Sequence, residues 1–171
     1  MKAKGTNPRF FVLVMAGALL AALAFAGEGE PHPAWEKMES LVGAWEGTAE
    51  GHPTKVSYRL VSNGTALEEN LSTAEGGDML SIYHRDGKRL LMTHYCSEDN
   101  QPRMQAAGLS PDGKRIDFSF VDVTNVSGPD APHMVGLALL FDDPNHLTQQ
   151  WTHKTSPGKQ QTSAFRFARK N

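Results

Sequence analysis

Ten short runs of alternating apolar and polar residues follow residue 43 and constrain the fold more than any other feature of the chain. Turn-forming pairs such as Asn63-Gly64 and Asp86-Gly87 separate these runs, and no second helical pattern interrupts them. Sequential hairpins at this spacing predict an all-β, up-and-down antiparallel β-barrel of about ten strands. The expected strands cover residues 44–50, 54–62, 65–72, 78–85, 88–96, 102–110, 114–121, 133–141, 146–154 and 161–169.

A single short amphipathic helix precedes the strands. Its apolar face consists of Trp35, Met38, Leu41 and Val42. Pro33 suits the first turn of this helix, and Gly43 suits its end. We expect the helix to close one end of the barrel. A closed sheet of about ten strands is wider than its side chains fill, so we also expect an enclosed cavity.

The chain divides into a leader, a linker and one domain. Residues 1–26 have a basic start, an apolar stretch and a small-residue cleavage site, which together are typical of a secretory signal peptide. Residues 27–33 form a polar linker, and residues 34–171 form the barrel domain. We therefore expect a secreted or periplasmic protein with no stable membrane anchor after cleavage.

Charge and cysteine content exclude several classes of partner. Without the leader, the 17 basic residues fall to 14 while all 19 acidic residues remain, so the mature net charge is −5. Nucleic acids and anionic membrane surfaces both require a basic face and are not expected partners. Cys96 is the only cysteine, so no internal disulfide forms, and the oligomeric state is left open.

The register of the first hairpin directs a carboxyl group inwards. A two-residue turn at Asn63-Gly64 pairs Tyr58 with Glu69 on an apolar face and Arg59 with Glu68 on the other. An inward carboxyl group costs free energy unless it is paired or protonated. Glu69 is therefore the main candidate for a functional polar group, and a purely structural hydrogen bond to Tyr58 is the alternative.

The second hairpin, at Asp86-Gly87, has two faces that both contain apolar groups. One face carries Tyr83, Leu90, Met92, His94 and Cys96, and the other carries Leu80, Ile82, His84, Leu91 and Tyr95. We take the first face as the interior, although the pattern alone leaves this choice open. His84 and His94 cannot share a side unless the turn contains a bulge.

Three residues could bind a metal or haem. His94 and Cys96 point the same way along a strand and could bind zinc or copper if His153 supplied a third ligand. We favour the alternative, a hydrogen-bonded interior histidine and a buried cysteine. His153, beside Trp151, could also be an axial haem ligand. We expect no resident cofactor, and haem is the open alternative.

The segment Leu41-Val42-Gly43-Ala44-Trp45-Glu46-Gly47-Thr48 resembles the Gly-x-Trp motif of the calycin superfamily, which includes lipocalins, fatty-acid-binding proteins and nitrobindin-like barrels. Residues 83–87, 93–96 and 100–104 look like those of uncharacterised exported bacterial proteins of lipocalin-like type. The resemblance implies that Trp45 packs under the barrel floor against Arg166 or Arg169. In nitrobindin-like members the haem histidine lies near the C-terminus, but the last expected strand here contains no histidine.

These observations predict an exported binding protein for a small hydrophobic or amphipathic ligand. The residues expected to line its cavity are Tyr58, Glu69, Tyr83, Met92, His94 and Trp151. The alternatives are a haem-binding or metal-binding barrel and an isomerase or hydrolase that uses Glu69 and His94 as an acid–base pair. The sequence contains no Gly-x-Ser-x-Gly elbow and no glycine-rich phosphate loop, so no catalytic residue is assigned.

Overall fold

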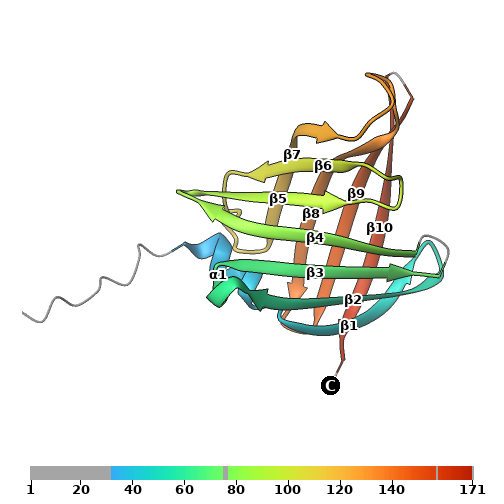
Figure 1. Ribbon diagram of the computed structural model, residues 1–171. Helices are drawn as coiled ribbons and strands as arrows, with labels where there is room; N and C mark the ends of the chain where they lie inside the picture. Colours follow the sequence, from blue (N-terminus) through green and yellow to red (C-terminus); the bar gives the residue numbers. More distant parts are fainter. Residues whose placement is uncertain (1–31, 75–76, 157, 171) are drawn as a thin grey trace, which may run out of the picture. The chain divides into compact units, whose positions relative to one another are not determined.

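The structure is a computed structural model that describes residues 32–74, 77–156 and 158–170, and these form a closed β-barrel (Figure 1). Each strand pairs antiparallel with the next, and the first strand pairs with the last. The predicted up-and-down barrel of ten strands is confirmed. The predicted signal peptide and all but the last residues of the predicted linker lie outside the described residues.

The strands are β1 (Gly43–Ala49), β2 (His52–Val61), β3 (Ala66–Thr73), β4 (Gly77–Asp86), β5 (Arg89–Tyr95), β6 (Gln101–Ala106), β7 (Arg115–Thr124), β8 (His133–Asp143), β9 (His146–Ser156) and β10 (Lys159–Arg169). A short 3-10 helix, η1 (Ser62–Gly64), lies between β2 and β3.

The helix α1 (Pro33–Glu39) lies at one end of the barrel (Figure 1). Pro33 occupies its first turn, and the His32 side chain accepts a hydrogen bond from the Trp35 backbone N–H at 3.1 Å. Trp35 and Met38 are buried, as the apolar spacing predicts. The described part of the chain contains no helix with the length and apolar character needed to cross a membrane.

The prediction that this helix ends at Gly43 is wrong. The last helical residue is Glu39, and Gly43 opens β1 with a φ of +129°, in the region that favours glycine. A Cβ at this position would lie 3.2 Å from the guanidinium of Arg169. Gly43 therefore lets the chain turn into the barrel and leaves space for that side chain.

Trp45 closes the helical end of the barrel from within. Its indole N–H donates to the Leu41 carbonyl at 2.8 Å, and the Arg169 guanidinium lies 4.1 Å from its ring centre. Arg169 also donates to the carbonyl oxygens of Val42 and Ser40, at 2.9 and 2.7 Å. Of the two arginines proposed for this contact, the structure selects Arg169.

The first hairpin has the predicted register, with Tyr58 opposite Glu69 and Arg59 opposite Glu68. Its turn is longer than two residues, because β2 ends at Val61 and β3 begins at Ala66. The extra residues extend the turn equally on both sides, so the strand pairing is unchanged.

The second hairpin has a different register from the predicted one. Asp86 pairs with Arg89, so Tyr83 faces Met92, whereas a two-residue turn at Asp86-Gly87 would pair Tyr83 with Leu90. The difference is two residues, and a shift of two keeps every side chain on its face. The predicted division into two faces therefore holds.

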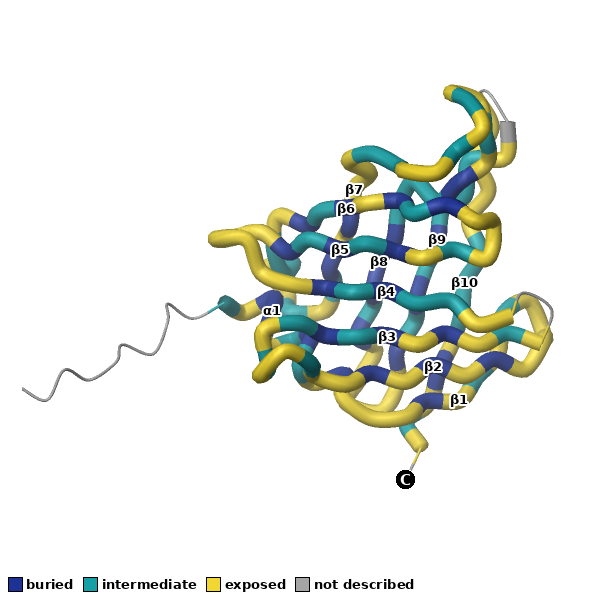
Figure 2. The backbone as a smooth tube through the Cα atoms, viewed as in Figure 1, coloured by how far each residue is buried: buried dark blue, intermediate teal, exposed yellow. Residues whose placement is uncertain are grey.

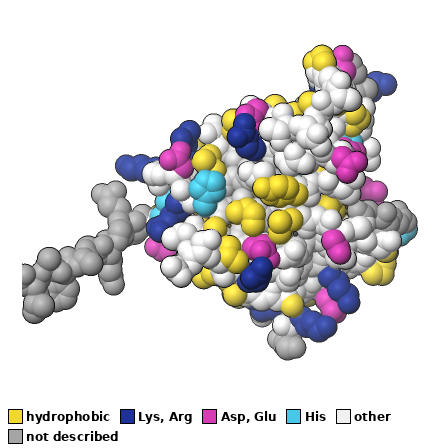
Figure 3. All heavy atoms as spheres, viewed as in Figure 1, with side chains coloured by type: hydrophobic (Ala, Val, Ile, Leu, Met, Phe, Trp, Pro, Cys, Tyr) yellow, Lys and Arg dark blue, Asp and Glu magenta, His cyan; other side chains and the backbone are white. Residues whose placement is uncertain are grey.

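The core lies inside the barrel, and buried and exposed residues alternate along most strands (Figure 2). Tyr83, Met92 and His94 are buried, which settles the inward face of β4 and β5. His84 is exposed, on the opposite side from His94. Apolar side chains also gather on the outer face over β4 and β5 (Figure 3), where Tyr95 is exposed.

Candidate functional site

The six residues predicted to line a cavity all point into the barrel and are brought together from five strands. They are Tyr58 on β2, Glu69 on β3, Tyr83 on β4, Met92 and His94 on β5, and Trp151 on β9. None of them exposes more than 2% of its surface. These side chains therefore occupy much of the space that the sequence predicted to be empty.

Glu69 is the centre of a hydrogen-bonded cluster, which we call the polar cluster. Its Oε1 accepts from the Ser81 hydroxyl at 3.2 Å, and its Oε2 accepts from the Tyr83 hydroxyl at 3.1 Å. Oε2 also accepts from Nε2 of Gln149 at 3.0 Å. Tyr58 also hydrogen-bonds this carboxyl group, so donors from β2, β4 and β9 converge on it.

Gln149 connects the cluster across the barrel. Its Nε2 donates to the Tyr58 hydroxyl at 2.6 Å as well as to Glu69, and its Oε1 accepts from the Trp151 indole N–H at 2.8 Å. An indole nitrogen can only donate, so Trp151 fixes which end of the Gln149 amide faces Glu69. The polar cluster consists of Tyr58, Glu69, Ser81, Tyr83, His94, Gln149 and Trp151.

Ser81 and Gln149 are the members that the sequence did not assign to the site. The alternation of side chains along a strand could have placed both on the inner face, because Ser81 is two residues from Tyr83 and Gln149 is two residues from Trp151. Their partners could not be foreseen, since Gln149 is 80 residues from Glu69 in the chain. That contact depends on closure of the barrel.

Burial controls the protonation of the cluster. It raises the pKa of Glu69, and the hydrogen bonds from Tyr58, Tyr83, Ser81 and Gln149 oppose this rise. The pKa values of Tyr58 and Tyr83 are raised well above their usual range, first by burial and then by the nearby charge of Glu69. Both phenols therefore remain protonated and available as donors.

His94 extends the cluster beyond Ser81. Its Nδ1 lies 3.0 Å from the Ser81 hydroxyl, and its ring centre lies 4.6 Å from that of Trp151. Burial lowers the pKa of His94 to about 4, so the ring is neutral at neutral pH. Within the described residues, its buried Nε2 has no hydrogen-bond partner. Such an unpaired group costs about 1–3 kcal/mol and calls for an explanation.

The residues proposed as metal ligands do not assemble around His94. His153 is hydrogen-bonded through Nε2 to Glu98 at 2.9 Å, and Cys96 lies beyond the end of β5, half-buried. Burial raises the pKa of the Cys96 thiol, which disfavours the thiolate that binds metals. Among the described residues, no three His, Cys, Asp or Glu side chains gather as a metal site.

A pocket of about 180 Å³, the distal pocket, lies at the end of the barrel opposite α1. It is lined by Ala49, Glu50, His52, Thr54, Thr73, Ala74, Ser163 and Phe165. Ser163 is paired with Trp151 in the β9–β10 ladder, and Phe165 is paired with Gln149. The distal pocket therefore adjoins two members of the polar cluster.

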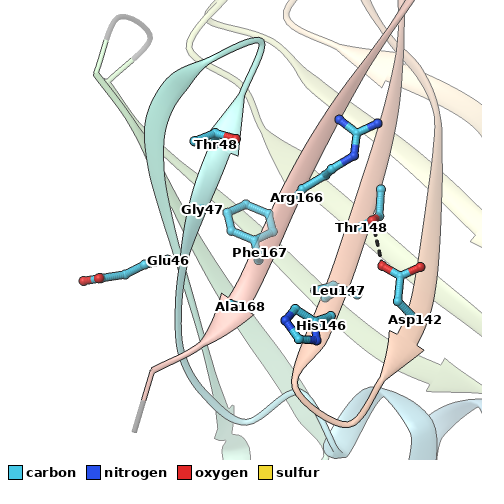
Figure 4. A pocket seen from close by; sticks show the side chains of 10 residues that line it. All are labelled: Glu46, Gly47, Thr48, Asp142, His146, Leu147, Thr148, Arg166, Phe167 and Ala168. Carbon is cyan, nitrogen blue, oxygen red and sulfur yellow. Dashed lines mark hydrogen bonds between the residues drawn. The ribbon is translucent and has the colours of Figure 1, made fainter.

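A hollow of about 420 Å³ on the outside of the barrel crosses β1, β10 and β9 (Figure 4). Arg166 lines it, which explains why this arginine does not reach Trp45 inside the barrel. Its two carboxylates already have partners, since Thr148 donates to Asp142 at 2.8 Å and Lys170 donates to Glu46 at 2.8 Å. The outer hollow is thus a poorer candidate than the polar cluster.

The fold and the site define a ten-stranded, helix-capped β-barrel with a polar cluster inside an apolar core. A comparison with protein-family models finds no match for the chain, and a comparison with curated proteins finds none either. Among solved structures, the barrel is similar to Rv2717c from M. tuberculosis, with a TM-score of 0.55 and 15% sequence identity. The match covers 81% of this chain and 98% of that chain. At this identity the likeness extends to the fold alone.

Proposed function

We propose that this protein is an exported carrier of lipocalin-like type that binds a small, largely apolar molecule with one polar group inside its barrel. The observation that carries this proposal is the unpaired Nε2 of His94, held in a buried, otherwise hydrogen-bonded cluster. A ligand that supplies the missing partner would remove the cost of leaving this atom unpaired.

The ligand enters from the distal end in this proposal. Half-buried apolar side chains of Met79, Met134 and Phe165 pack against the core there, and Phe165 lines the distal pocket. Trp151 lies between this pocket and His94, because it is paired with Ser163 and packs on the His94 ring. Movement of the Trp151 side chain would connect the pocket to Nε2.

The size of the distal pocket limits the ligand. Sites for drug-sized molecules measure about 300–1,000 Å³. The distal pocket measures about 180 Å³, so we infer a ligand of one or two rings, or a short chain of similar volume. Its apolar part would contact Phe165 and Trp151, and its polar part would reach the cluster.

Native mass spectrometry of the protein purified from its own source tests this function. We expect an added mass of a small molecule that is lost on denaturation. The Glu69→Gln variant should retain a cooperative fold and bind less of the same molecule. Its matched control is Glu68→Gln, because Glu68 lies on the outer face, where it pairs with Arg59. Unaltered binding by Glu69→Gln would remove Glu69 from the site.

The contact between Glu69, Ser81 and His94 favours one second function, an isomerase or hydrolase. The carboxyl group and the imidazole both lie within hydrogen-bond distance of the Ser81 hydroxyl, so this hydroxyl links two groups that can give and take protons. The test is a bell-shaped pH–rate profile on a small substrate that disappears in both Glu69→Gln and His94→Gln. A profile that survives both changes would exclude this use of the cluster.

A further inference from the structure

Glu69, Ser81 and His94 form a linear chain of three buried groups on neighbouring strands. Glu69 is paired with Ser81 across β3 and β4, and Ser81 is paired with His94 across β4 and β5. One hydroxyl oxygen lies 3.2 Å from the carboxyl Oε1 and 3.0 Å from the imidazole Nδ1. All three side chains expose 1% or less of their surface, so water does not interrupt the chain.

The second oxygen of the Glu69 carboxyl group, Oε2, accepts two further hydrogen bonds. Oε2 of Glu69 accepts from Tyr83 and from Nε2 of Gln149, and Trp151 holds the Gln149 amide in that orientation. A carboxylate accepts at both oxygens, which matches the donors that face it. Oε1 then receives the single hydrogen of the Ser81 hydroxyl.

The position of that hydrogen determines the tautomer of His94. A serine hydroxyl has one hydrogen to donate and lone pairs to accept with. If Ser81 donates to Glu69, its oxygen can only accept from His94, so Nδ1 must carry the imidazole proton. Nε2 of the neutral ring is then left with a lone pair, and it is the ring nitrogen further from the Cβ of this inward-facing side chain.

We propose that the Glu69–Ser81–His94 chain makes Nε2 of His94 a hydrogen-bond acceptor, and that the protein thereby selects apolar ligands that carry a hydroxyl group. The inference rests on the proposed function and adds to it the chemical class of the ligand. An alcohol or phenol would donate to Nε2 while its apolar part packs on Trp151. A ligand with only an ether or carbonyl oxygen would face a lone pair with another lone pair.

Glu69→Gln should reverse the polarity of the site. Tyr83 and Gln149 still donate, so the new amide oxygen must face them and the amide NH₂ must face Ser81. Ser81 would then accept from this amide and donate to Nδ1 of His94. The imidazole proton would move to Nε2, which becomes a donor.

The test uses three probes of similar shape: 2-naphthol, 2-methoxynaphthalene and 2-methylnaphthalene. The protein is expressed as the full chain and purified, and binding is measured by calorimetry. We expect the wild type to bind the naphthol about tenfold more tightly than either other probe, the effect of one buried hydrogen bond. In Glu69→Gln the naphthol and the ether should bind alike, and both should bind more tightly than the hydrocarbon.

Two controls and one spectroscopic measurement accompany the titrations. Glu68→Gln should keep the wild-type order, and His94→Leu should bind all three probes alike. Nitrogen-15 NMR of the histidine rings should show His94 protonated at Nδ1 in the wild type and at Nε2 in Glu69→Gln. This readout needs no ligand, and an unfolded variant would be recognised in the same spectrum.

The possible results distinguish a failure of the proposed hydroxyl selectivity from a failure of the proposed carrier function. Equal binding of all three probes by the wild type, or a wild-type His94 protonated at Nε2, would overturn the inference and leave the carrier function standing. Failure of the wild type to bind any probe would overturn the carrier function together with the inference.

Discussion

At the scale of single residues, the protein maintains a carboxyl group and an imidazole in a dry interior through complementary partners. Glu69 is surrounded by donors, and His94 is held neutral beside Ser81. Hairpin parity predicted that Glu69 faces inward, whereas the inward face of His94 was left open by the pattern and is decided by its burial in the structure. The sequence could not identify the unpaired Nε2 of His94, since that depends on which groups from distant strands reach the ring.

The burial of His94 makes stability depend on pH. Its pKa in the fold is about 4 against the usual 6.5, so the unfolded chain binds the extra proton first as the pH falls. The contribution of neutral His94 to the free energy of unfolding is present above pH 6.5. It falls by about 3 kcal/mol as the pH falls towards 4. Urea unfolding between pH 7 and pH 4 should show this loss, and His94→Gln should show much less of it.

Glu69 should have the opposite effect on the free energy of unfolding as the pH falls. Burial raises its pKa, so its contribution is present below the unfolded pKa and is lost as the pH rises through the folded pKa. The Glu69→Gln variant lacks this opposing effect and should lose stability on acidification more steeply than the wild type. If stability in the same urea series fell with pH equally steeply in Glu69→Gln and the wild type, the raised pKa assigned to Glu69 would be contradicted.

At the scale of elements, closure of the barrel depends on the contact between its first and last strands. Gly47 on β1 faces Phe167 on β10, and a Cβ added at Gly47 would lie 1.8 Å from the Arg166 carbonyl oxygen. The sequence predicted the number and order of strands, because turn residues and period-two patterns are local. It placed the helix end and the second hairpin turn incorrectly and made the first turn too short. Gly43 opens β1 beside Arg169, a contact that local patterns do not specify, and Asp86 pairs with Arg89.

Gly47→Ala tests the strand contact. The added methyl group meets backbone atoms that cannot rotate away, so β1 and β10 must separate and the free energy of unfolding should fall by about 3 kcal/mol. The control is Gly128→Ala, where the added Cβ would have nothing within 4 Å. Equal stability of the two variants in urea would show that this contact does not limit closure.

Arg169→Ala tests the closed end of the barrel. The variant loses the contact with the Trp45 ring and the hydrogen bonds to Val42 and Ser40, so we expect a loss of about 1–2 kcal/mol. Arg166→Ala, on the outer face of the same strand, should change stability by less than about 0.5 kcal/mol. A larger loss of stability in Arg166→Ala than in Arg169→Ala would contradict the assignment of Arg169 as the arginine that packs on Trp45.

At the scale of the whole molecule, α1 and Trp45 close one end of the barrel, and the distal pocket lies at the other. The sequence predicted the barrel and six inward side chains correctly, but it predicted more empty space than the side chains leave. Side-chain volume and the hydrogen bonds of Gln149 decide that space, and neither follows from the alternation of residues.

The purified protein should be colourless and free of stoichiometric metal. His153, the candidate haem ligand of the alternative interpretation, already contacts Glu98, and the candidate metal ligands do not assemble around His94 among the described residues. Absorption spectra and elemental analysis of protein from its own source check this. A Soret band that is lost in His153→Ala or His94→Leu would contradict the expectation.

Mapping a bound probe tests the central claim most directly. Amide NMR spectra recorded during titration with 2-naphthol should shift at residues of the distal pocket and at His94 and Trp151, and should leave the outer hollow around Arg166 unchanged. Shifts confined to the outer hollow, or spread evenly over the surface, would contradict a binding site inside the barrel.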